Sequence, residues 1–141
     1  MKKASKKLTD QQKTEKLRKR CVALAKEISK KRDGYKCQYC GIGKPQRQVH
    51  SHHIFHEGMF KSMSADPDNL ITICAIHHMA GKWVNSRGWN IHGSPRESTE
   101  WIQALIPERY AELKQRSLQY QKLDIIYWNK KLEELKNYDK E

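Results

Sequence analysis

Residues 49–79 read VHSHHIFHEGMFKSMSADPDNLITICAIHHM, and this stretch decides the fold. It contains six of the seven histidines of the chain. Residues 49–55 combine β-branched and aromatic residues with histidines, which is typical of a short strand. Leu70–Ile73 predicts a second strand, and a run of turn-forming residues separates the two. From about Ala75 the residues favour a helix, which Gly81 interrupts.

Two adjacent histidines, His52 and His53, occupy the first predicted strand. Successive side chains of a strand point to opposite faces. These two histidines therefore cannot face the same way, and they can hold different roles. His50 is two positions before His52 and can share its face. We expect His50 to be polar strand surface, and a supporting contact beside His52 is the alternative.

A second pattern pairs Cys37 and Cys40 with Cys74 and His77, which have the same spacing. Gly41 follows the first pair and can take the positive φ that turns backbone amides toward the sulfurs. Three thiolates and one imidazole suit tetrahedral zinc, and four protein ligands leave no open position. We therefore expect a structural Zn²⁺. A disulfide is the alternative, but it suits a secreted chain, and the N-terminus lacks the apolar region of a secretory signal.

These residues resemble the HNH nucleases, also called His-Me finger or ββα-metal nucleases. The matching motifs are His52-His53-Ile54, Asn69-Leu70 and Cys74-Ala75-Ile76-His77-His78, with His78 nine positions after Asn69. The family usually has cysteine where His77 stands, and imidazole also binds zinc. The resemblance covers residues 34–82, about a third of the chain.

The resemblance implies a role for four residues. His53 is the general base, His52 and His78 hold a divalent metal ion, and Asn69 braces the loop and orients the base. The implied reaction is hydrolysis of DNA phosphodiester bonds to 5′-phosphate and 3′-hydroxyl ends. It needs an activated water and a cation near the scissile phosphate. We expect Mg²⁺ or Mn²⁺, with Mg²⁺ favoured by availability, although two imidazoles also suit manganese, nickel or zinc.

Other polar residues lie within or near the motif. We expect His56 to be an ordinary loop histidine and His92 to lie away from the site. Lys82 and Arg87 are candidate phosphate contacts, and ordinary surface is the alternative for both.

The charge of +12 is concentrated at one end of the chain. Residues 1–32 hold 13 Lys and Arg against 3 Asp and Glu, whereas the remaining 109 residues hold 15 against 13. A basic arm of this kind attracts phosphates without recognising sequence. We therefore expect contact with DNA, and a solvated tail is the alternative.

The chain divides into four predicted parts. Residues 1–14 form a disordered basic arm and residues 15–33 a basic amphipathic helix, in which Cys21 is a buried free thiol. Residues 34–97 form the zinc-stapled core, and residues 98–141 form a helical tail. The apolar face of the first helix is formed by Leu17, Cys21, Leu24, Ala25 and Ile28, at helical spacing.

The tail predicts three helices. Ser98 or Thr99 can cap the first, which runs to about Ile106, and Pro107 can start the second. A last helix from about Leu123 carries an apolar stripe. This stripe could pack on the chain's own body or pair with a second copy, which makes a homodimer possible. Its members are Ile125, Trp128, Leu132 and Leu135.

The sequence thus predicts an α+β protein with a small ββα-metal core between a basic helix and C-terminal helices. No apolar run approaches the roughly 20 residues of a membrane span, and mean hydropathy is −0.95, so we expect a cytoplasmic protein with DNA as its partner. The layout resembles small phage-type HNH proteins, including recombination nucleases of the NinG/Rap kind, which implies a role in phage recombination, packaging or homing.

Two alternatives to a nuclease remain. One is a non-catalytic zinc module that binds DNA or RNA; the pair His52-His53, together with Asn69 and His78, argues against it, because a zinc finger needs none of them. The other is an accessory subunit whose tail helices recruit a larger phage or repair machine.

Overall fold

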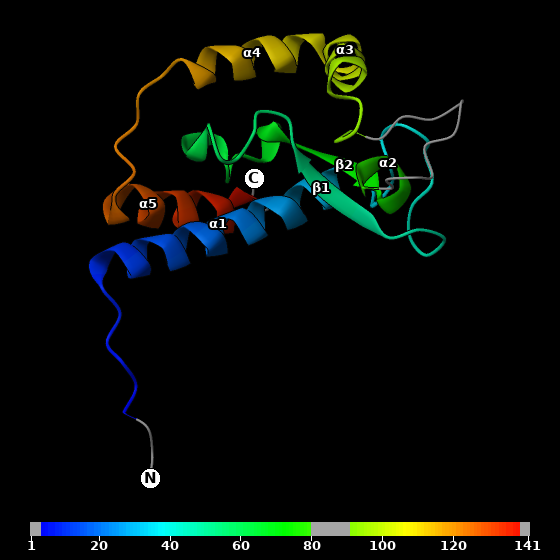
Figure 1. Cartoon of the computed structure of the whole chain (residues 1–141). Coiled ribbons are helices and arrows are strands. Elements are labelled where there is room, and N and C mark those ends of the chain that lie inside the picture. The colour runs from blue at the N-terminus through cyan, green and yellow to red at the C-terminus, as the bar shows by residue number, and fades with distance from the viewer. Residues whose placement is uncertain (1–3, 80–90, 139–141) are drawn as a thin grey trace.

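The computed structural model describes residues 4–79 and 91–138. Figure 1 shows a small two-stranded sheet with helices on either side. The sheet pairs β1 (Val49–His53) with β2 (Leu70–Cys74), and α2 (Ala75–Met79) follows directly. The remaining elements are α1 (Asp10–Arg32), η1 (Lys61–Met63), η2 (Pro67–Asn69), α3 (Pro95–Leu105), α4 (Pro107–Ser117) and α5 (Ile125–Lys136). The α+β class and the zinc-stapled ββα core are confirmed.

The first helix begins earlier than the sequence predicts. α1 starts at Asp10, so the prediction of disorder up to residue 14 is wrong for residues 10–14. The Thr9 hydroxyl accepts the amide hydrogen of Gln12 at 3.2 Å, and the Gln12 side chain accepts that of Thr9 at 2.9 Å. This capping box fixes the first turn. Residues 4–9 have no regular structure and extend away from the body (Figure 1).

The helix ends where the sequence predicts. Asp33 is the C-cap residue, and Gly34 follows with a φ of +65°, a conformation that costs glycine little. The Tyr35 amide then donates to the Lys30 carbonyl at 2.8 Å. This turn directs the chain away from α1 and into the first cysteine pair.

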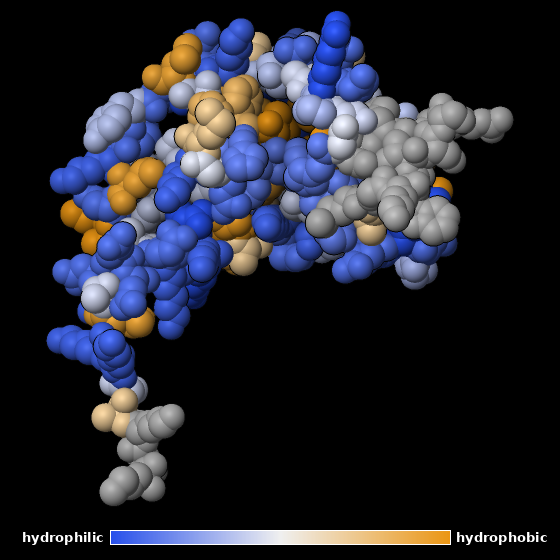
Figure 2. Space-filling model, viewed as in Figure 1, coloured by the Kyte–Doolittle hydropathy of each residue, from blue (hydrophilic) through white to orange (hydrophobic). Residues whose placement is uncertain are grey.

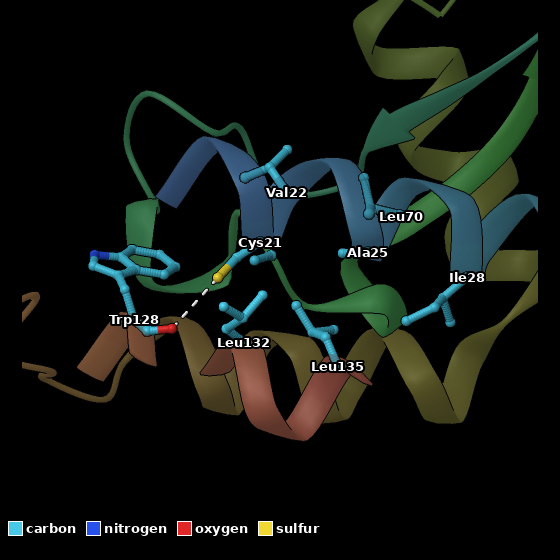
Figure 3. Packing of buried hydrophobic residues seen from close by; sticks show 9 residues of the cluster. Cys21, Val22, Ala25, Ile28, Leu70, Trp128, Leu132 and Leu135 are labelled. Carbon is cyan, nitrogen blue, oxygen red and sulfur yellow. Dashed lines mark hydrogen bonds between the residues drawn. The ribbon is translucent and has the colours of Figure 1, made fainter. Parts of the chain in front are cut away.

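α5 packs along α1, and Figure 3 shows the interface. Trp128, Leu132 and Leu135 of α5 are buried against Cys21 and Ala25 of α1. The Cys21 thiol donates to the Trp128 carbonyl at 3.4 Å, so its prediction as a buried free thiol is confirmed. Three of the four residues of the apolar stripe thus pack on the chain's own body and are not exposed for pairing with a second copy, whereas Ile125 is 42% exposed.

All five residues of β2 are buried, because apolar clusters lie on both of its faces. Leu70 belongs to the cluster between α1 and α5. Ile71 and Ile73 point the other way, into a second cluster with Ile102 of α3 and with Cys37. β2 is therefore the element that joins the two halves of the core.

Several predicted boundaries differ from the structure. β1 ends at His53, not Phe55, because the backbone amide and carbonyl of Phe55 both form hydrogen bonds with the Asn69 side chain.

α3 starts at Pro95, so Ser98 does not cap it; the Ser98 hydroxyl lies inside the helix and donates to the Pro95 carbonyl. Proline suits the first helical position, since its missing N–H needs no partner there. A boundary at 97/98 consequently cuts through α3.

The last helix is short and well capped. α5 begins at Ile125, because the Asp124 carboxylate accepts the Tyr127 amide hydrogen at 2.9 Å. Leu123, where the sequence suggested a start, precedes the cap and packs against the α1–α5 cluster.

Figure 2 shows a mostly hydrophilic face, on which apolar side chains form separate patches. Among the helices of the described residues, none is long and apolar enough to cross a membrane.

The α1–α5 packing generates the first testable prediction. Trp128 is 1% exposed, so Trp128→Ala should lower the free energy of unfolding by about 3–5 kcal/mol through the cavity it leaves. Ile126 lies on the same helix but is 74% exposed, and Ile126→Ala should change stability by no more than about 0.5 kcal/mol. Urea denaturation of both variants measures the difference. Equal midpoints would show that α5 does not pack on α1.

Candidate functional site

The histidines of β1 divide between the two faces of the strand. The Ser51 hydroxyl donates to the Lys26 carbonyl of α1 at 3.0 Å, so Ser51 faces α1. Alternation puts His53 on that side and His50 and His52 on the opposite side. The predicted separation of His52 from His53 is therefore what the pairing of β1 with β2 produces.

Three imidazoles form a cluster beside β1. One nitrogen from each of His52, His78 and His92 lies within 4.8 Å of the other two. His78 Nε2 and His92 Nε2 are 3.0 Å apart. The prediction that His92 lies away from the site is therefore wrong. His50 is half-buried with its ring centroid 5.1 Å from that of His78, so it supports this cluster rather than forming free strand surface.

The cluster suits a divalent metal ion. Burial, together with the charges of nearby His78 and His92, lowers the pKa of His52 to about 3. Burial, followed by the charge of His92, lowers the pKa of His78 to about 4. Both rings are therefore neutral at pH 7, and neutral imidazole is the form that binds metal. Because the nitrogens already converge, the donor set fits a divalent metal ion.

His53 is held in one orientation by the loop between the strands. Its Nε2 lies 2.8 Å from the Ser64 carbonyl oxygen. A carbonyl only accepts hydrogen bonds, so Nε2 carries the proton and Nδ1 keeps its lone pair. Nδ1 lies 3.8 Å from Glu57 Oε2, and the other oxygen of Glu57 accepts from Arg18 of α1 at 2.7 Å. Burial lowers the pKa of the His53 ring.

Asn69 braces this loop from within the protein. It is fully buried, and its Nδ2 donates to the carbonyls of Phe55 and Met63, each at 3.1 Å. Its Oδ1 accepts the Phe55 amide hydrogen at 2.8 Å. Met63 precedes Ser64, so Asn69 fixes the position of the carbonyl that orients His53. In the described structure Asn69 is thus a positioning residue that does not reach the cleft.

The histidines open onto a cleft of about 470 Å³. α1 contributes Arg18 and Lys26 to its lining, the loop after β1 contributes Glu57, and η1 contributes Lys61. Sequence patterns did not single these four out, because only tertiary packing brings α1 beside the loop. His56 also lines the cleft, and its Nδ1 accepts the Gly58 amide hydrogen, as suits a loop histidine. Lys82 and Arg87 lie outside the described residues.

The second cluster joins Cys37, Cys40, Cys74 and His77, whose ligand atoms all lie within 4.8 Å of one another. The sulfurs of Cys40 and Cys74 are 3.8 Å apart, and Cys74 Sγ is 3.2 Å from His77 Nδ1. Sulfurs about 2.3 Å from one tetrahedral zinc lie about 3.8 Å apart. All four cysteines of the chain are free thiols, so the disulfide alternative is not what the structure shows.

The turn around the first cysteine pair depends on two glycines. Gly41 has a φ of +75°, and its amide donates to the Cys37 carbonyl at 2.8 Å. Gly43 pairs with Lys36, and a Cβ at Gly43 would collide with the Tyr35 carbonyl oxygen. The role of Gly41 is predictable from the sequence, whereas that of Gly43 follows from the close approach of two backbone segments.

A cation lies beside the thiols. Arg47 Nη1 is 3.7 Å from Cys40 Sγ and 3.8 Å from Cys74 Sγ. Burial opposes ionisation of Cys74, but the His77 amide and the Arg47 guanidinium outweigh it and lower the pKa of the thiol. Three thiolates around Zn²⁺ leave one net negative charge, which Arg47 offsets. The set therefore fits a structural zinc ion.

Comparison with known proteins agrees with this geometry. Residues 37–80 match the family model HNH endonuclease. The match begins at Cys37 and includes β1, β2 and α2, so this part of the chain is an HNH domain. His92 and the helices α1, α3, α4 and α5 lie outside it. No curated protein and no solved structure matches the chain.

The thiol cluster generates the second prediction. The purified protein should hold about one tightly bound zinc ion per chain, and Cys40→Ser should lose it and unfold at a much lower temperature. Cys21→Ser is the matched control, since Cys21 is a buried free thiol outside the cluster and its replacement should leave the zinc content unchanged. Elemental analysis and thermal melts measure both. A chelated wild type that melts at an unchanged temperature would exclude a structural role for zinc.

Proposed function

We propose that the HNH domain at residues 37–80 makes this chain a metal-dependent endonuclease that hydrolyses DNA phosphodiester bonds. One observation carries the proposal. The Nε2 atom of His53 donates a hydrogen bond to the Ser64 carbonyl, which leaves Nδ1 as the acceptor nitrogen of the ring. His53 lines a cleft together with the imidazole cluster of His52, His78 and His92. A zinc-stabilised binding module would need neither arrangement.

In this mechanism His53 is the general base. Its Nδ1 lone pair takes the proton of the attacking water, while the bond from Nε2 to Ser64 keeps the ring in place. The resulting imidazolium faces the Glu57 carboxylate, whose charge favours the protonated ring. Arg18 holds that carboxylate in place from α1. The orientation of the base thus depends on both the loop and the first helix.

His52 and His78 are the proposed ligands of the catalytic ion. When bound, a divalent ion there supplies polarisation of the scissile phosphate and neutralisation of charge on the leaving oxygen. The other residues of the chain bind and orient the substrate around it. By its family resemblance the reaction leaves 5′-phosphate and 3′-hydroxyl ends.

Lysines are better suited than arginines to hold the DNA backbone here. Arg18 is committed to Glu15 and Glu57, and Arg32 to Asp33 and two carbonyls. Lys26 and Lys61 line the cleft itself. Burial lowers the pKa of His53 and of His78, and the charge of Lys26, which lines the same cleft, acts in the same direction.

The cellular setting forms part of the proposal. Free thiols in a Cys₃His set suit a reducing compartment such as the cytoplasm. The exposed segment before α1 and the helices after the HNH domain fit a small phage-type nuclease of recombination, packaging or homing. Assays on supercoiled plasmid, linear duplex and four-way junction DNA, each with added metal, identify the substrate among these.

The catalytic roles generate the third prediction. His53→Ala removes the proton acceptor but leaves the imidazole cluster, so DNA and metal should still bind while cleavage falls roughly 10²–10⁴-fold. Higher pH should restore part of this rate, because hydroxide replaces the activated water. His52→Ala and His78→Ala should instead be rescued in part by high metal concentration and less by pH.

The comparison of these rescue patterns is the measurement that checks the roles. If His53→Ala cleaves DNA at the wild-type rate, the proposed mechanism is wrong. The non-catalytic zinc module would then be the better interpretation.

The lining of the cleft generates the fourth prediction. Lys26→Ala should weaken binding of all DNA sequences to a similar extent and reduce the log–log salt slope by about 1, because one phosphate contact is lost. Alanine keeps the helix propensity of α1. Lys114→Ala, at an exposed position on α4, is the control and should leave the slope unchanged. Identical slopes for Lys26→Ala and wild type would remove Lys26 from the DNA contacts.

A further inference from the structure

We infer that His92 is a third ligand of the catalytic ion, so that His52, His78 and His92 form a three-imidazole site for a transition metal ion rather than for Mg²⁺. The inference rests on the proposed metal site of the HNH domain and extends it beyond residue 80. It assigns a role to a residue from the segment that leads into α3.

The distances between the rings fit ligation of one ion. Two ligands about 2.1 Å from one ion and at right angles lie about 3.0 Å apart. His78 Nε2 and His92 Nε2 are separated by 3.0 Å. The ring centroid of His92 also lies 5.0 Å from that of His52 and 4.7 Å from that of His78. His92 is therefore as close to each proposed ligand as they are to each other, at 5.4 Å.

The position of His92 beside His78 depends on contacts made by the preceding residue, Ile91. The Ile91 amide donates to the His77 carbonyl at 2.8 Å, which ties the segment before α3 to the helix that carries His78. The Ile91 side chain is 3% exposed and belongs to the same apolar cluster as Ile73. The Ser98 hydroxyl of α3 lies 3.4 Å from the Ile91 carbonyl. His92 thus follows an anchored residue and is directed at His78.

The donor set decides which ions the site prefers. Mg²⁺ selects oxygen ligands and retains its waters, so three nitrogens suit it poorly. Imidazole suits first-row transition ions, with affinity rising from Mn²⁺ through Co²⁺ to Ni²⁺. His52, His78 and His92 would hold such an ion and would leave part of its coordination shell to phosphate oxygens and water. This preference replaces the expectation of Mg²⁺, which was based on two imidazoles and availability.

The third ligand also gives the ion a structural effect. An ion held by all three rings would join β1, α2 and the segment leading into α3. Since it binds the folded arrangement and not the unfolded chain, its binding should raise the melting temperature. This effect is measurable without DNA or cleavage.

The test uses the full chain with zinc already in the Cys₃His site, titrated with Co²⁺. Visible absorption of Co²⁺ reports nitrogen and oxygen ligation, and the lack of a thiolate charge-transfer band shows that zinc stays in place. Wild type should bind one Co²⁺ and melt at a higher temperature with it. His92→Ala should bind Co²⁺ at least about 10–100-fold more weakly, the loss typical of even an outer contact to a metal ligand.

Two variants sharpen the comparison. His56→Ala changes a histidine of the same cleft outside the cluster and should bind Co²⁺ like wild type. His92→Asp keeps a ligand but replaces nitrogen with oxygen, so it should shift the preference toward Mn²⁺ and Mg²⁺. This gain cannot come from general destabilisation.

The outcomes separate this inference from the proposed function. Wild-type Co²⁺ affinity in His92→Ala, with loss in His78→Ala, overturns the third ligand and leaves the two-ligand nuclease site intact. Unchanged affinity in both variants rejects the ion site itself. A preference of the wild type for Mg²⁺ over Co²⁺ would also overturn the inference.

Discussion

The buried amide of Asn69 is the contact on which the site depends. It makes three hydrogen bonds with backbone groups of Phe55 and Met63, and it ends β1 by taking Phe55 out of the strand ladder. Each backbone group left without a partner in this buried position would cost about 1–3 kcal/mol. The loop therefore has one favoured shape. In this conformation the Ser64 carbonyl lies beside Nε2 of His53, and the Glu57 carboxylate lies beside Nδ1 of the same ring.

A two-stranded sheet is barely stable alone, so the surrounding elements must hold it. α1 does so with its apolar face and with polar contacts, since Arg32 donates to the Leu70 carbonyl and Ser51 to the Lys26 carbonyl. The same helix supplies Arg18 and Lys26 to the cleft. One surface of α1 is thus shared between core and site. A change of its packing would move the brace of His53 as well as a proposed phosphate contact.

Features that arise within a short stretch were predictable from the sequence, and features that arise from tertiary packing were not. Strand alternation separated His52 from His53, and ligand spacing identified the Cys₃His set. The capping box of Thr9 and Gln12 could also have been predicted from the sequence. The lysine-rich composition of residues 1–14 favoured disorder instead. No local sequence pattern could predict that Glu57, Arg18 and His92 line the cleft. Each belongs to a segment whose position depends on tertiary contacts with other parts of the chain. The site roles of these histidines stay predictions until the variants are measured.

The two metal clusters are coupled through neighbouring residues of α2. The side chain of His77 belongs to the thiol cluster, and the next residue, His78, faces the imidazole cluster. The carbonyl of His77 accepts the Ile91 amide, which positions His92. Because α2 has only five residues, its own hydrogen bonds cannot fix it firmly. A zinc ion in the proposed Cys₃His site would therefore set the direction of α2, and through it the placement of His78 and His92. In the proposed arrangement, zinc at the Cys₃His site would do more than stabilise a small core, because it would also orient the imidazoles proposed to hold the catalytic ion.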